Sequence, residues 1–80
     1  MVEVRYFAAI ADAVGKPGEL LDLPAGSTIA DLRATITATY GPKLEPMLAV
    51  CAYLIGDELT RDTTTPLTPR VDVLPPFAGG

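Results

Sequence analysis

The sequence predicts a small α+β domain in which one main helix packs across a mixed β-sheet. Three observations support this fold class: apolar and polar residues alternate near both ends of the chain, one apolar stripe of helical spacing lies between them, and 80 residues allow a single core. Apolar residues make up 49% of the chain, which is enough for a compact interior.

The first quarter of the sequence predicts two short strands. Residues 2–8 alternate with the period of a half-buried strand, residues 9–13 could form a short helical turn, and residues 15–18 (Gly-Lys-Pro-Gly) predict a turn. Residues 19–23 predict a second strand, which we expect to pair with the first. The buried face of the first strand would carry Val2, Val4, Tyr6 and Ala8.

The middle of the sequence predicts the one main helix. Its apolar stripe, at spacings of three, four and four residues, consists of Ile29, Leu32, Ile36 and Tyr40. Thr28 and Asp31 have the spacing of a capping box at the N-terminus, and Gly41 followed by Pro42 would end the helix. Because three threonines within this segment are weak helix formers, we expect packing against the sheet to hold the helix.

The second half of the sequence predicts the remaining strands. Residues 43–47 read as a loop, residues 48–55 as an apolar central strand, and residues 58–60 as a short edge strand. A turn-rich connection over 63–69 leads to an alternating strand at 70–74. If the first and last strands lie side by side at the centre of a four- to five-stranded sheet, the fold is a β-grasp.

Composition excludes several classes of function. The chain has ten acidic against six scattered basic residues, a net charge of −4, which argues against nucleic-acid binding. It contains no histidine and one cysteine, so a His-based triad and a His/Cys zinc site are excluded, and no metal site is expected. This composition makes the chain a poor candidate for an enzyme.

Cys51 lies in an apolar run, so we expect a buried core thiol rather than a nucleophile. A single cysteine cannot form an internal disulfide, which favours a reducing compartment. Residues 1–5 carry charges where a signal peptide would be apolar, and no apolar run approaches the length of a bilayer span. We therefore expect a cytoplasmic protein.

The last six residues are the most informative segment. We expect residues 1–74 to form the domain and residues 75–80 to form an extended tail, because Pro75 and Pro76 favour extended backbone. Gly79 and Gly80 have no side chains, so the terminal carboxylate is the functional group. Gly80 would carry the chemistry, and Gly79 would let the tail pass through a narrow channel of a partner.

Apolar side chains on otherwise charged strand faces predict a docking surface at the root of the tail. Phe7 shares its face with charged residues of the first strand, and Leu74 shares its face with Asp72. Isolated exposed apolar residues are common, and a loop around Leu59 could instead cover these two. We expect Phe7, Leu59 and Leu74 to contact partners, with Pro75, Pro76 and Phe77 of the tail.

Three segments of the sequence resemble the small, MoaD-like subunit of molybdopterin synthase, in the MoaD/ThiS family of ubiquitin-like sulfur carriers. They are Arg5-Tyr6-Phe7-Ala8, the stretch from Leu23 to Leu32, and Val71-Asp72-Val73-Leu74-Pro75-Pro76-Phe77-Ala78-Gly79-Gly80. The terminal motif is the most specific of the three. The resemblance implies a β-grasp fold.

The resemblance also implies a sulfur-transfer cycle. A ubiquitin-activating-type (MoeB-like) enzyme would consume ATP and Mg²⁺ to adenylate Gly80, a sulfur donor would displace AMP, and the large (MoaE-like) synthase subunit would accept the thiocarboxylate for molybdopterin synthesis. The carrier itself would bind no cofactor. Related Gly-Gly carriers serve thiazole (thiamine) or cysteine synthesis, and a protein modifier or plain interaction module stays open as an alternative.

Overall fold

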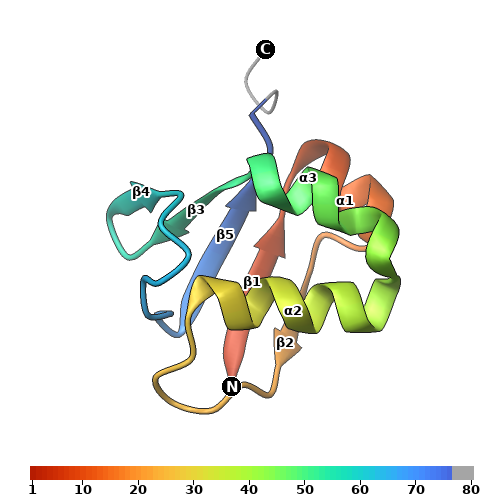
Figure 1. The fold of residues 1–80 in the computed structure, drawn as a ribbon. Helices are drawn as coiled ribbons and strands as arrows, with labels where there is room; N and C mark the ends of the chain where they lie inside the picture. The colour runs from red at the N-terminus through yellow and green to blue at the C-terminus, as the bar shows by residue number, and fades with distance from the viewer. Residues whose placement is uncertain (77–80) are drawn as a thin grey trace.

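The structure is a computed structural model and describes residues 1–76. Within this range, five strands form one mixed sheet in the order β2-β1-β5-β3-β4, and the helices cover one of its faces (Figure 1). In chain order the elements are β1 (Val2–Tyr6), α1 (Ala8–Val14), β2 (Gly18–Leu21), α2 (Ile29–Tyr40), the 3-10 helix η1 (Pro42–Leu44), α3 (Glu45–Val50), β3 (Ala52–Ile55), β4 (Glu58–Thr60) and β5 (Arg70–Leu74).

The first and last strands form the centre of the sheet, as a β-grasp requires. β1 and β5 run parallel, with Val4 opposite Val71 and Tyr6 opposite Val73. β2 adds to β1 and β3 adds to β5, both antiparallel, and the short strand β4 completes the far edge. The predicted fold class, the central strand pair and the edge strand at 58–60 are therefore confirmed.

The core lies between the sheet and the helices. The alternating residues of β1 and β5 point inward and are buried, and the predicted stripe of α2 packs against them, with Tyr40 at its margin half-buried. The predicted capping box is present: Asp31 N–H donates to Thr28 Oγ1, and Thr28 N–H donates to the Asp31 carboxylate. The N–H groups of Ile29 and Ala30, the first two residues of α2, donate to backbone carbonyls of the connector 61–69, so the N-terminal N–H groups of the helix have partners.

The N-terminal strands are shorter than predicted. β1 ends at Tyr6 because Ala8 has a left-handed backbone (φ 52°) and starts a two-turn helix, so Ala8 is exposed rather than part of the strand's buried face. The helical turn expected at 9–13 is thus the longer helix α1, which buries Ile10 and Val14. β2 spans Gly18–Leu21 instead of residues 19–23.

The prediction for residues 43–55 was wrong in its first half. Residues 42–50 form η1 and α3, and only Ala52–Ile55 form the strand β3. Pro46 occupies the first turn of α3, where a proline is tolerated because its missing N–H would have no partner inside the helix. Leu48 is buried in the helix rather than in a strand, so the apolar run serves the same core in a different conformation.

A polar cluster fixes the strand β2 to the far end of α2. Tyr6 and Tyr40 both donate hydrogen bonds to Glu19 Oε2, at 2.6 and 2.8 Å. Lys16 Nζ lies 3.5 Å from the other oxygen of the same carboxylate. These contacts join residues up to 21 positions apart, so nothing local in the sequence indicated them.

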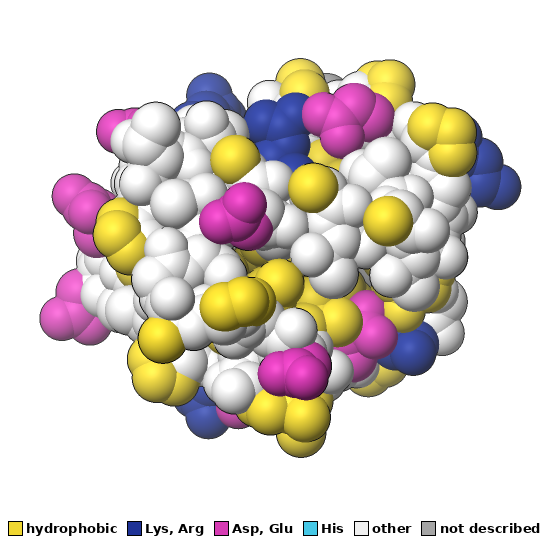
Figure 2. Space-filling view, turned by 60° about the horizontal axis from the view of Figure 1, so that its bottom comes forward, with side chains coloured by type: hydrophobic (Ala, Val, Ile, Leu, Met, Phe, Trp, Pro, Cys, Tyr) yellow, Lys and Arg dark blue, Asp and Glu magenta, His cyan; other side chains and the backbone are white. Residues whose placement is uncertain are grey.

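Charge is dispersed over the surface. Figure 2 shows acidic and basic side chains scattered over one face, some of them adjacent to one another, with no stripe of basic residues on that face. The expectation that the chain does not bind nucleic acid still rests on its composition. In the described part of the chain, no helix is long and apolar enough to cross a membrane.

Candidate functional site

The tail leaves the domain at the end of β5. Leu74 is the last residue of that strand and is half-buried, Pro75 is buried against the domain, and Pro76 is exposed. The exposed part of the chain therefore begins at Pro76, and the division into a domain of residues 1–74 and a tail of residues 75–80 stays a prediction. The expectations for Phe77, Gly79 and Gly80 fall outside the described residues.

The face of the sheet opposite the helices carries two cross-strand ion pairs. Glu3 lies opposite Arg70 and Arg5 lies opposite Asp72, so each charge of β1 faces an opposite charge of β5. The Arg70 Nε–Glu3 Oε1 distance is 3.4 Å and the Arg5 Nε–Asp72 Oδ1 distance is 3.7 Å. Among residues 1–76, Asp72 Oδ1 is buried without a hydrogen-bond donor. These pairs explain why the central strands keep charged residues on a face that no helix covers.

Apolar side chains border these charges on two sides. The ring of Phe7 lies 5.4 Å from the Arg5 guanidinium carbon, so it shares the open face with Arg5. The β1–β5 register places Phe7 one position beyond the Tyr6–Val73 pair, level with Leu74. Leu59 is 59% exposed and pairs with Leu54, which itself lies opposite Asp72.

The predicted docking residues are therefore arranged as follows. Phe7 and Leu74 are half-buried and lie at the tail end of the open face, on neighbouring strands. Leu59 shares this face but lies on the edge strand β4, which is separated from β5 by the strand β3. It does not cover Phe7 and Leu74. Leu54, which the sequence prediction did not include, continues the apolar surface inward from Leu59.

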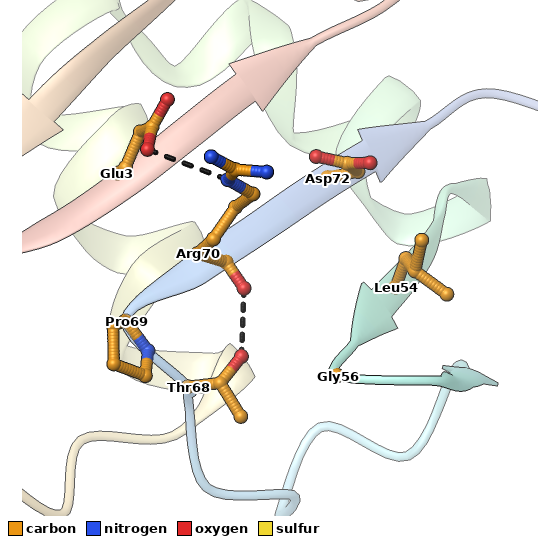
Figure 3. Close-up of a pocket in the computed structure, with 7 residues that line it drawn as sticks. All are labelled: Glu3, Leu54, Gly56, Thr68, Pro69, Arg70 and Asp72. Carbon is orange, nitrogen blue, oxygen red and sulfur yellow. Dashed lines mark hydrogen bonds and ion pairs between the residues drawn. The ribbon is translucent and has the colours of Figure 1, made fainter.

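A shallow groove of about 470 Å³ opens on the same face, at the end of the sheet away from the tail. Its lining includes Glu3, Arg70 and Asp72, and Figure 3 shows the Arg70 side chain between the two carboxylates. Thr68 Oγ1 donates to the carbonyl oxygen of Arg70 and fixes the start of β5. The groove is lined by paired charges and a backbone turn, and none of its lining residues is a cysteine, serine or histidine.

Cys51 is buried, with 1% of its surface exposed, as predicted. Its thiol donates to the carbonyl oxygen of Met47, and burial raises its pKa above the ordinary value. Both features keep the sulfur protonated and weakly nucleophilic. Within residues 1–76, no group of three or more potential metal-ligating side chains is close enough to bind an ion.

Sequence reasoning missed part of the surface around the tail. α3 ends at Val50, two residues before Ala52, which lies opposite Leu74. Val50 is 50% exposed, and α1 begins at Ala8, just after β1, the strand that pairs with β5. Both helices therefore have an end near the point where the tail leaves β5 (Figure 1). We name this region the tail-root surface; its residues are the exposed Ala8, Ala49 and Val50. It was missed because residues 48–50 were predicted to be strand.

Comparison with protein families gives one match. A model of the ThiS family matches residues 4–80, which is nearly the whole chain. Among curated proteins, none matches the sequence significantly.

Solved structures that are similar over almost their full lengths include the following three. A putative molybdopterin converting factor, subunit 1, from Pyrococcus furiosus has a TM-score of 0.77 at 24% identity, covering 94% of this chain and 95% of that one. SAMP1 from Haloferax volcanii has a TM-score of 0.77 at 19% identity, with 99% and 98% covered. The small archaeal modifier protein 1 from Methanosarcina acetivorans has a TM-score of 0.71 at 25% identity, with 99% and 95% covered.

Proposed function

Because the chain belongs to the ThiS family of small ubiquitin-like sulfur carriers, we propose that it carries sulfur on the carboxyl group of Gly80 for molybdenum cofactor synthesis in the cytoplasm. The observation that carries this proposal is the family match, which extends through the Gly-Gly motif to residue 80. The location of the exposed chain supports it. Pro76 leaves the central strand of the sheet beside an apolar surface, where a partner can bind the domain and receive the tail.

The chemistry that we propose divides between the carrier and its partners. A carboxylate is a poor acyl donor because its leaving group would be oxide. In an adenylating enzyme of the ubiquitin-activating type, the Gly80 carboxylate attacks the α-phosphorus of Mg²⁺-bound ATP, and pyrophosphate leaves. Hydrosulfide from a sulfur donor then attacks the carbonyl carbon of the acyl adenylate, AMP leaves, and a thiocarboxylate remains. The carrier supplies the acyl group, and the partners supply the catalytic groups and the nucleotide site.

The molybdenum cofactor pathway is the finer part of the proposal. The similarity to the molybdopterin converting factor subunit and the Pro75-Pro76-Phe77 sequence before the Gly-Gly motif both favour it. The acceptor would then be the large subunit of molybdopterin synthase. We propose that this subunit and the adenylating enzyme both use Phe7, Leu74 and Leu59, so the carrier binds them one at a time.

A second candidate function is protein modification. The small archaeal modifier protein 1 of Methanosarcina acetivorans, at 25% identity, favours it. In that case the activated Gly80 carboxyl would form an isopeptide bond with a lysine of another protein instead of accepting sulfur. Intact mass of the protein purified from cells separates the two functions: a thiocarboxylate exchanges one oxygen for sulfur, whereas an isopeptide adds a whole protein.

Deletion of Gly80 tests the proposed site. We expect the wild-type chain to support ATP–pyrophosphate exchange by its adenylating enzyme and then to gain sulfur. Removing Gly80, or adding one residue after it, displaces the carboxylate by about 3.3 Å and should abolish exchange, because in-line attack tolerates only small displacements. The deleted chain should still compete with the wild type for the enzyme. Normal exchange and sulfur gain by the deleted chain would refute the carrier function.

A further inference from the structure

We propose that the tail-root surface is a contact site for the rim of the adenylating enzyme's active-site channel, and that an uncharged rim must touch it for Gly80 to reach ATP. This inference rests on the proposed function and adds to it a second contact surface, at the end of the domain. The open face of the sheet bears the docking residues proposed above, whereas Val50, Ala49 and Ala8 belong to the helix layer.

The first argument is the length of chain available. Pro75 is buried and Pro76 is the first exposed residue, so the domain holds the tail up to that point. Four residues follow Pro76, the last of them Gly80, and four fully extended residues span at most about 14 Å. A reaction centre that binds ATP and excludes water lies below the surface of its enzyme. Each ångström of separation between the two proteins therefore subtracts directly from the depth that Gly80 can reach.

The second argument is the chemistry of the side chains around the exit. None of the residues of the tail-root surface is charged, although the chain as a whole carries sixteen charged side chains in 80 residues, ten acidic and six basic. Val50 is 50% exposed at the end of α3, and its neighbour Ala49 is also exposed. An uncharged rim can contact such residues without desolvating an ion, and short side chains let the two backbones come close.

The third argument is the backbone at Ala8. Its φ of 52° is uncommon for a residue other than glycine and costs some conformational energy. This turn ends β1 at once and directs α1 back over the sheet, so the helix begins with exposed Ala8 instead of extending past the end of β5. Neither helix therefore extends along the tail: α1 begins at Ala8 and turns back over the sheet, and α3 ends at Val50.

Val50→Trp tests the requirement for close approach. Tryptophan keeps the site uncharged but enlarges it, so it separates close approach from simple apolar attraction. We expect the rate of ATP–pyrophosphate exchange at saturating carrier to fall about ten-fold or more, because small displacements of a reacting group carry large costs in rate. Leu20→Trp is the matched control: Leu20 is 64% exposed on β2, and exchange should stay within two-fold of wild type.

A rescue experiment then identifies the cause of the loss. One glycine inserted after Pro76 lengthens the tail by about 3.3 Å. This insertion should raise the exchange rate of Val50→Trp several-fold and lower the exchange rate of the wild type. Melting temperatures establish that the variants fold, and Ala49→Trp replaces Val50→Trp if the latter does not. Exchange as fast as wild type in the tryptophan variant, or a loss that the insertion does not reduce, would overturn the inference. A wild-type chain that supports no exchange would instead refute the proposed function.

Discussion

Replacing Glu19 by glutamine should destabilise the domain far more than an ordinary surface substitution. The Glu19 carboxylate accepts both tyrosine hydrogen bonds on one oxygen, and the Tyr6 ring that donates one of them is buried. Glutamine has nearly the same shape and keeps one carbonyl oxygen for the two hydroxyl groups. The substitution therefore removes the negative charge and leaves the packing almost unchanged.

The magnitude follows from the two hydrogen bonds. Hydrogen bonds to a charged group contribute about 1.5–3 kcal/mol each and neutral hydrogen bonds about 0.5–1.5 kcal/mol. Each of the two tyrosine hydrogen bonds should therefore contribute about 1 kcal/mol less to stability in Glu19→Gln. The Lys16 ion pair adds little, because the lysine side chain is 45% exposed. We expect a loss of about 2 kcal/mol in the free energy of unfolding, or about 8–16 °C in melting temperature for a domain of this size.

Urea and thermal unfolding of wild type and Glu19→Gln measure this loss. Glu45→Gln is the matched control: that carboxylate pairs with Arg33 but is 48% exposed, so we expect a clearly smaller loss than for Glu19→Gln. Equal losses in the two variants would show that the Glu19 cluster contributes nothing special and would refute the reasoning.

The same cluster predicts a dependence on pH. Burial raises the pKa of Glu19, but hydrogen bonds from Tyr6 and Tyr40 and the charge of Lys16 outweigh burial, so the pKa lies below its ordinary value. Its contribution is fully present above the ordinary pKa of a glutamate and is lost as the pH falls through the lowered value. Wild-type stability should therefore decline in acid more steeply than that of Glu19→Gln; parallel profiles would contradict this.

Three further predictions concern the core, the helix cap and docking. Cys51→Ala should lose about 1–2 kcal/mol of stability through the small cavity it leaves, and sulfur charging should continue; a folded variant that cannot be charged would indicate an internal sulfur relay. Thr28→Ala should cost about 1 kcal/mol of stability in urea unfolding, because Asp31 loses its side-chain acceptor; no loss would show that the connector alone caps α2. Phe7→Asp or Leu74→Asp should weaken binding to the adenylating enzyme by about 2 kcal/mol in calorimetry, whereas Leu20→Asp should not; a collapsed melting temperature with intact binding would place these side chains in the core instead.

The sequence was sufficient for the elements that local rules determine. The stripe of α2, its capping box and the alternation of β5 each follow from a spacing of a few residues, and each was predicted with nearly correct bounds. The segment 42–50 was not, because an apolar run without a clear period fits a buried helix as well as a buried strand. Its helix α3 tolerates Pro46 in its first turn and packs Leu48 into the core.

The candidate site divides in the same way. The apolar residues on charged strand faces could be found from alternation alone, and the structure places Phe7 and Leu74 level with one another. Asp72 without a donor and exposed Val50 at the tail root could not be found, because both depend on where distant strands and helices meet. The same holds for Glu19, whose partners are 13 and 21 residues away.

The pairing of β1 with β5 also has a consequence for how the protein is made. Glu3 and Arg70 are 67 positions apart, so the central pair of the sheet closes a loop of most of the chain, and such non-local contacts slow folding. While the ribosome still holds residues 70–74, the nascent chain lacks the strand that joins both halves of its sheet. Folding must therefore follow synthesis of that strand, and because β5 leads directly into Pro75 and Pro76, only a chain that has completed its sheet presents a tail in a defined position. The order of the strands therefore makes presentation of the tail conditional on complete folding of the sheet.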